Sequence, residues 1–187
     1  MSGALQGLLS RQSVGIKHLQ EPGPSDEQLQ HMVEAALRAP DHAGLVPFRF
    51  AVVRGATRER LGHLFTQAAI EGGKSEADAQ IDGERARRAP VTVTVIARID
   101  SGHPLVPAHE QWACVGGALT NLLNAAHAMG FGGKMLSGSK VRQPALQQAF
   151  CEPGETLLGW IALGTPADSP SRKVAKPRAA DVLREWK

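Results

Sequence analysis

Aromatic residues are scarce in this sequence of 187 residues, which holds no tyrosine, five phenylalanines and three tryptophans. Proteins that bind single-stranded nucleic acids stack the bases on aromatic side chains beside a basic surface. This chain has 21 lysines and arginines and 18 aspartates and glutamates, so its net charge is only +3. The basic residues are scattered, apart from short clusters at residues 85–88 and near the C-terminus. We therefore expect no nucleic-acid partner.

Cysteines and long apolar runs are also few. Only Cys114 and Cys151 are present, and no histidines cluster at the spacing of metal ligands. The sequence therefore indicates neither a disulfide framework nor a metal site, and it suits a reducing compartment. No apolar run approaches the roughly 18 residues that a membrane-spanning helix needs. The N-terminus lacks the basic stretch and apolar core of a signal peptide, so we expect a cytoplasmic protein without a membrane segment.

The common motifs of nucleotide-binding proteins and hydrolases are missing. The chain contains no G-x-G-x-x-G after a strand, no Walker loop, no G-x-S-x-G and no H-E-x-x-H. The glycine-rich segment 129–133 follows a helical pattern, so it is interpreted as a helix stop, with Gly130 as a left-handed C-cap.

What the sequence does contain is the composition of a folded domain. Apolar residues make up 42% and charged residues 21%, and the length suits one domain over residues 1–187. Residues 166–187 are rich in Pro, Ser, Lys and Arg. This segment is too polar to fold alone, so we expect an extended C-terminal tail that lies on a partner subunit.

Helices are expected to outweigh strands. Ser25 and Gln28 form a capping box before one helix, and Pro40 ends it. Val91, Val93 and Val95 alternate as on one face of a buried strand. Helices are predicted over 4–9, 25–37, 57–69, 109–129 and 141–150, a surface helix with loops over 71–88, and strands over 48–53, 90–97 and 156–163. Separate strands joined by helices indicate an α+β fold in which helices cover a sheet.

Three polar loops are candidates for chemistry. Arg11-Gln12-Ser13 combines a guanidinium and a hydroxyl beside a helix end, which suits a phosphate group. A solvated arginine and a capping serine are the simpler interpretation. In Arg38 to His42 an acid and an imidazole follow the helix, and a hydrogen-bonding loop is favoured over a catalytic triad because no nucleophile accompanies them.

The third loop, Phe131 to Gly138, is glycine-rich. Its backbone could approach a planar ligand closely, and Lys134 could neutralise an anion. The alternative is a turn between two helices.

The order of these segments resembles the nitroreductase family, especially its small single-domain branch. The similar segments are Arg11-Gln12-Ser13, Glu21 to Leu29, Arg38 to His42, Pro47 to Phe50, Glu110-Gln111, Phe131 to Gly138 and Leu163 to Pro166. No segment is specific alone. R-x-S, R-A-P-D-H about 25 residues later and F-G-G-x-x-x-S-G downstream are specific in combination.

The resemblance implies an intertwined homodimer with two FMN sites at the subunit interface. Arg11, Gln12 and Ser13 would then contact the flavin phosphate and ribityl chain. Arg38 and His42 match residues that reach the flavin from the other subunit.

Met135-Leu136-Ser137 matches a third flavin-contacting segment, but relatives of this branch often read W-R-S there. Lys134 is a candidate replacement for that missing arginine at the phosphate, as are Lys176 and Arg178 in the tail.

The segment from Ala125 to Gly130 is similar to one that is sometimes assigned to the nicotinamide nucleotide. Ala125, Ala126, Ala128 and Gly130 are therefore candidate contacts of NAD(P)H, with helix packing as the alternative.

The resemblance implies an oxidoreductase in which NAD(P)H reduces FMN and a nitroaromatic, a quinone or a similar small molecule is reduced in a ping-pong cycle. No side chain need act as an acid or base. Dehalogenation or flavin fragmentation on the same fold is a first alternative. A flavin- or heme-binding protein without turnover is a second, and nucleic-acid binding through the basic tail is a third.

Overall fold

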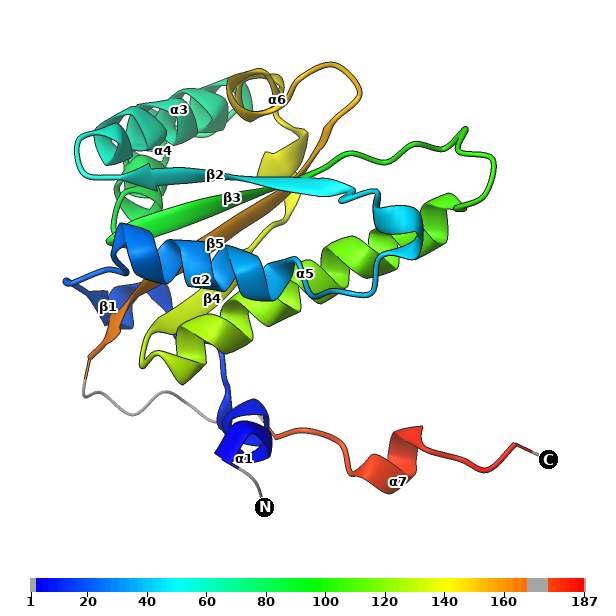
Figure 1. Ribbon diagram of the computed structural model, residues 1–187. Coiled ribbons are helices and arrows are strands. Elements are labelled where there is room, and N and C mark those ends of the chain that lie inside the picture. The colour runs from blue at the N-terminus through cyan, green and yellow to red at the C-terminus, as the bar shows by residue number, and fades with distance from the viewer. Residues whose placement is uncertain (1–2, 168–174, 187) are drawn as a thin grey trace.

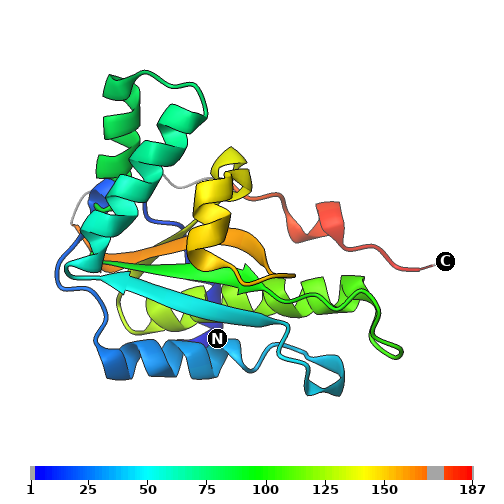
Figure 2. The same ribbon diagram turned by 90° about the horizontal axis from the view of Figure 1, so that it is seen from above.

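The computed structural model describes residues 3–167 and 175–186, and a central sheet lies between two layers of helices (Figures 1 and 2). In chain order the elements are α1 (Gly3–Ser10), η1 (Ile16–His18), β1 (Leu19–Gln20), α2 (Asp26–Ala36), η2 (His42–Gly44), β2 (Phe48–Arg54), α3 (Thr57–Glu71), α4 (Glu76–Ala86), β3 (Val91–Ala97), α5 (Ala108–Ala128), β4 (Gly132–Leu136), η3 (Ser139–Arg142), α6 (Pro144–Phe150), β5 (Thr156–Pro166) and α7 (Ala179–Val182), where η marks a 3-10 helix. Figure 2 shows α2 and α5 on one face of the sheet and α3, α4 and α6 on the other. The predicted α+β fold with a helix-covered sheet is confirmed.

Strand β5 pairs with three other strands. It runs antiparallel to β3 along one edge and to β4 along the other, and its last two residues pair with β1. β2 extends the sheet beyond β3. Every residue of β3 is buried, and Val91, Val93 and Val95 all belong to the core that the sheet shares with α2 and α5. The predicted alternation is therefore confirmed.

Helix α2 begins at the predicted capping box. The Ser25 hydroxyl accepts a hydrogen bond from the Gln28 backbone N–H at 3.2 Å, and the Gln28 side chain accepts one from the Ser25 N–H at 2.8 Å. The chain leaving α2 packs closely on α5, where a Cβ added to Gly117 would lie 3.2 Å from the Ala39 Cβ. The small residues of α5 therefore permit the close packing that the sequence predicts.

On the opposite face of the sheet, an aromatic cluster lies between the strands and helices α3 and α6. The Trp160 ring on β5 meets the Phe65 ring of α3 edge-on, with the ring centroids 4.8 Å apart. Phe150 of α6 makes a second edge-on contact with Trp160. These contacts hold α3 and α6 against the sheet.

Strand β4 corrects the sequence-based interpretation of residues 131–138 as a turn between helices. Two glycines favour a loop in isolation, but tertiary packing requires them here. A Cβ added to Gly132 would lie 2.8 Å from Leu19 Cδ2, and one added to Gly133 would lie 2.9 Å from Leu123 Cδ2. The strand can approach its neighbours only because both side chains are absent.

The elements also differ from the prediction in other places. The helix expected over 141–150 divides into η3 and α6, because Pro144 begins α6 at a position where its missing N–H costs nothing. The two-residue strand β1 was not predicted. Strand β5 continues to Pro166, three residues past the predicted end, and the Ala167 N–H donates to the His18 carbonyl at 2.8 Å.

Helices α1 and α7 contain no buried residues, and Figure 1 shows both outside the layers that enclose the sheet, with α1 below α5. The exposed apolar side chains in these two regions include Leu9 of α1, which is 66% exposed, and Trp186, which follows α7 and is 98% exposed. The others are Leu5 and Leu8 on α1, and Val182 and Leu183 at α7. One chain alone therefore leaves these apolar side chains uncovered.

An ion network ties the ends of three strands together. The side chain of Glu155 is buried and accepts hydrogen bonds from Arg49 Nε and Arg98 Nε, each at 2.7 Å. Arg49 Nη2 and the Glu152 N–H also donate to this carboxylate, at 2.5 Å and 2.8 Å. The Arg49 hydrogen bonds outweigh desolvation, and with the other two they lower the pKa of Glu155 from 4.5 to about 2.

We expect Glu155→Gln to lower the free energy of unfolding at neutral pH by about 1–2 kcal/mol, because it removes the ion pairs with Arg49 and Arg98. Solvent around these partly exposed arginines screens the pairs and keeps the loss this small. The folded-state pKa of Glu155 is depressed, so this stability is complete above pH 4.5 and is lost as the pH falls toward 2. The difference in unfolding free energy between the parent and Glu155→Gln should therefore become smaller in acid. Urea unfolding at several pH values measures it, with Glu152→Gln as the exposed control. A gap of constant size down to about pH 3 would contradict this role.

Candidate functional site

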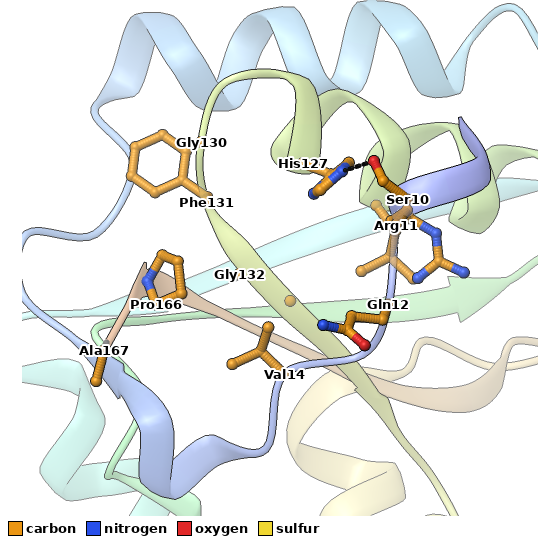
Figure 3. A pocket seen from close by; sticks show the side chains of 12 residues that line it. Ser10, Arg11, Gln12, Val14, His127, Gly130, Phe131, Gly132, Pro166 and Ala167 are labelled. Atoms are coloured by element: carbon orange, nitrogen blue, oxygen red, sulfur yellow. Dashed lines mark hydrogen bonds between the residues drawn. The ribbon is translucent and has the colours of Figure 1, made fainter. Parts of the chain in front are cut away.

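Arg11 lies in a pocket at the junction of α1, α5 and β4, with a volume of about 250 Å³. Arg11 follows the last residue of α1, and its N–H caps the helix by donating to the Gly7 carbonyl at 3.1 Å. The lining residues are Ser10, Arg11, Gln12, Val14, Leu123, His127, Gly130, Phe131, Gly132, Gly133, Pro166 and Ala167. In the view of Figure 3, Arg11, Gln12 and His127 lie toward one end and Phe131, Pro166 and Ala167 toward the other.

The chemistry of this pocket suits an anion. Arg11 offers a guanidinium, Gln12 an amide and His127 an imidazole, and none of the lining residues is a carboxylate. Gly130 has φ of +87°, which confirms the predicted left-handed C-cap of α5. Ser13 is exposed and lies just outside the lining. The predicted loop and the end of α5 thus meet around one cationic pocket.

A second cavity, also of about 250 Å³, lies on the face of the sheet that α3 and α4 cover. Leu136 and Ser137 line it, together with Phe65 and Trp160. The Ser137 hydroxyl donates to the Leu158 carbonyl at 2.9 Å, which fixes the end of β4 against β5. Leu136 and Ser137 of the predicted third flavin segment therefore border a cavity whose lining is mainly apolar.

The rim of this second cavity carries an ion cluster whose carboxylate, Asp82, is buried. The Asp82 carboxylate accepts hydrogen bonds from Lys140 Nζ at 2.6 Å and Lys74 Nζ at 2.7 Å. Burial opposes ionisation of Asp82, but the two lysines outweigh it and lower the pKa of this carboxyl below its ordinary value. The cluster ties η3, which follows Ser137 and Gly138, to α4.

A groove of about 770 Å³ separates α1 from α2 and α5. Arg38, Ala125 and Ala128 border it, and the small residues Gly3 and Gly7 of α1 lie opposite. Ala126 corrects one prediction, because its side chain is fully buried in the core and cannot offer a surface to a ligand. Packing, the alternative interpretation, describes that residue.

His42 lies in η2, near the start of α5. Its Nδ1 is 2.8 Å from the Glu110 carboxylate, and the neighbouring Asp41 accepts hydrogen bonds from the backbone of Leu45 and Val46. The favoured hydrogen-bonding loop is confirmed. Among residues 3–167 and 175–186, no cluster of three potential metal ligands occurs, and no helix is long and apolar enough to cross a membrane.

The predicted site residues fall into separate groups. Arg11, Gln12 and Gly130 share the first pocket, Leu136 and Ser137 the second cavity, and Arg38, Ala125 and Ala128 the groove. His42 joins none of these groups. Met135 packs against the core with α2 and α5, and half-buried Lys134 lines none of the three. One chain therefore does not bring Arg38 or His42 into the Arg11 pocket.

Two pocket residues, Ser10 and His127, were not predicted as site residues. Ser10 Oγ and His127 Nε2 lie 3.0 Å apart although 117 positions separate them in the chain. A lone histidine in an alanine-rich helix carries no sequence signal of a site, and only the folded chain reveals the contact.

The sequence model of the nitroreductase family matches residues 8–165. The Escherichia coli (strain K12) protein YdjA, provisionally named an NAD(P)H nitroreductase, is 38% identical over 177 residues, which are 93% of this chain and 94% of YdjA.

Two solved structures share the fold. The nitroreductase-like family protein from Bacillus cereus is 18% identical with a TM-score of 0.85, over 100% of this chain and 97% of its own. A provisionally named nitroreductase from Desulfovibrio desulfuricans, solved in complex with FMN, is 24% identical with a TM-score of 0.74, over 100% and 98%. The family match and the identity to YdjA agree with the motifs in the sequence: the chain belongs to the nitroreductase family and is an enzyme of that family.

Proposed function

We propose that the protein is an FMN-dependent oxidoreductase that uses NAD(P)H to reduce nitroaromatics, quinones or similar small electrophiles in a ping-pong cycle. The observation that carries the proposal is the cationic Arg11 pocket, which is formed by two segments of the family pattern and lined by no carboxylate. The name of YdjA and the FMN in the Desulfovibrio desulfuricans structure support the choice of cofactor and electron donor.

The donor set of the pocket fits the phosphate end of FMN. Arg11 would hold the phosphate through a charge-assisted hydrogen bond, and Gln12 and Ser13 would hold the adjoining ribityl chain. When bound, FMN supplies the hydride and electron transfer chemistry. The protein supplies binding, orientation and a space that the nicotinamide and the acceptor occupy in turn, so no catalytic acid or base is assigned. Ala125, Ala128 and Gly130 stay candidate contacts of NAD(P)H.

We propose further that each flavin site is built from two chains of a homodimer. Arg38 and His42 lie outside the Arg11 pocket of their own chain, which is what a contribution to the partner's site requires. The apolar side chains of α1 and α7 that one chain leaves exposed are the surface such a partner would cover.

A flavin- or heme-binding protein of the same fold that does not carry out this NAD(P)H-dependent turnover is the second candidate. It is favoured by Leu136, which stands where relatives often have arginine and borders a mainly apolar cavity. Purified protein that is yellow, with an absorbance maximum at about 450 nm, would establish that the protein binds a flavin. Rapid anaerobic bleaching by NADPH would then support turnover, and persistent colour would favour the non-catalytic candidate.

We expect Arg11→Ala to weaken FMN binding roughly tenfold to a hundredfold, because a charge-assisted hydrogen bond contributes about 1.5–3 kcal/mol. Flavin fluorescence titration measures the dissociation constant. Arg88→Ala is the control, since Arg88 is exposed and lines neither the Arg11 pocket nor the groove. Equal affinity of Arg11→Ala and the parent would exclude Arg11 as a phosphate ligand.

A mixed dimer tests the shared site. One subunit carries Arg11→Ala and the other Arg38→Ala, so that one flavin site collects both defects and the other collects neither. The heterodimer should then retain about half of the parental FMN. Sites built from single chains would each carry one defect instead. Two different tags allow the heterodimer to be purified, and a count showing no tightly bound FMN would refute the two-chain site.

Removal of residues 168–187 should weaken dimerisation or flavin retention. The described part of this tail, residues 175–186, is exposed throughout and offers Val182, Leu183 and Trp186 to a partner. Sedimentation and bound-flavin absorbance measure the two effects. Truncation after Ala167 keeps the hydrogen bond between Ala167 and His18, so the sheet stays intact. A truncated dimer that is fully yellow would argue against exchange of the tails.

A further inference from the structure

His127 occupies the wall between the Arg11 pocket and the groove beneath α1, and it borders both. The charged residues that share these two cavities with it are Arg11 and Arg38, and neither cavity is lined by an aspartate or glutamate. An imidazolium at this place would have no carboxylate in the lining to pair with. An anion that enters the Arg11 pocket is the complementary charge.

Hydrogen bonding determines which nitrogen of His127 a ligand can use. The Ser10 hydroxyl has one proton, and it donates that proton to the Gly7 carbonyl at 3.1 Å. The Ser10 oxygen therefore accepts the hydrogen bond from His127 Nε2 at 3.0 Å. Nδ1 has no hydrogen-bond partner among the described residues, and it becomes a donor only when the ring is protonated.

We propose that His127 is an additional anion-binding residue of the Arg11 pocket, oriented by Ser10, whose protonated ring donates from Nδ1 to the phosphate group that Arg11 binds. The identity of that phosphate as the flavin's rests on the proposed function. The existence of the anion site rests on Ser10, Arg11 and His127 alone. Because Nδ1 can donate only when the ring carries its second proton, this contact makes phosphate binding tighter as the pH falls.

The test compares the parent with His127→Gln, which keeps a donor to Ser10 but cannot gain a proton. FMN affinity is measured by fluorescence titration at about pH 6 and pH 8. His127→Gln should bind FMN roughly tenfold more weakly than the parent at the lower pH and within about twofold at the higher pH. Ionisation of free FMN is the same in both titrations. His63→Gln, an exposed histidine on α3, is the matched control and should follow the parent.

Two further measurements separate the parts of the proposal. Riboflavin, which lacks the phosphate, should show no difference between parent and His127→Gln at either pH. Ser10→Ala removes the acceptor that orients His127, and it should reduce the gain in affinity at low pH without changing the charge of the protein.

Some results would overturn the proposal. Equal FMN affinity of parent and His127→Gln at both pH values refutes it, and so does an equal loss for riboflavin. A loss confined to the NADPH affinity of the flavin-loaded protein refutes the assignment to the flavin phosphate.

If the parent binds no FMN, the proposed function fails. The anion site is then tested with inorganic phosphate by NMR. A shift of the His127 ring signals, identified by their loss in His127→Gln, supports the site, and unmoved signals refute it.

Discussion

The pairing of β5 with β3, β4 and β1 is the constraint on which the arrangement of this molecule depends. β5 forms hydrogen bonds along both of its edges, so its neighbours must pack closely against it, and at some positions only a residue without a side chain fits. At Gly159, where φ is +145°, a side chain would collide with the Leu136 carbonyl oxygen. At Gly164 an added Cβ would lie 2.9 Å from Pro90 Cδ. Glycine at these positions lets β4 and the chain before β3 close on β5.

Because β4 is held in this way, it positions two groups of candidate residues. Its first residues line the Arg11 pocket, and its last residue lines the cavity beside Trp160. The Val14 N–H donates to the Gly133 carbonyl at 3.0 Å, so the chain after Ser13 is tied to the same strand. A five-residue strand thus sets the separation between the Arg11 pocket and the cavity that Leu136 borders. Rigid strands position ligand groups more precisely than free loops do.

The proposed homodimer would complete what one chain leaves open. Exposed apolar residues lie near both chain ends, on α1 and around α7. The groove lined by Arg38 lies beside the C-terminal half of α5. A second chain that covered them could also bring Arg38 and His42 to the Arg11 pocket. In this proposal dimerisation and cofactor binding share the same surface, which is why the mixed dimer tests both.

The sequence by itself determined the features that depend on residues close together in the chain. These are the capping box of Ser25 and Gln28, the alternation of the β3 valines, the left-handed Gly130 and the order of motifs that identifies the family. Tertiary structure alone decided that Gly132–Leu136 is a strand, that Ala126 is buried and that Ser10 meets His127. Glycine has no side chain and so adds nothing to a hydrophobic pattern that would predict a strand. Ser10 and His127 are 117 positions apart, so no local sequence pattern predicts their contact. These residues take up their roles only in the folded chain, where the strands pair around β5 and the C-terminal ends of α1 and α5 meet.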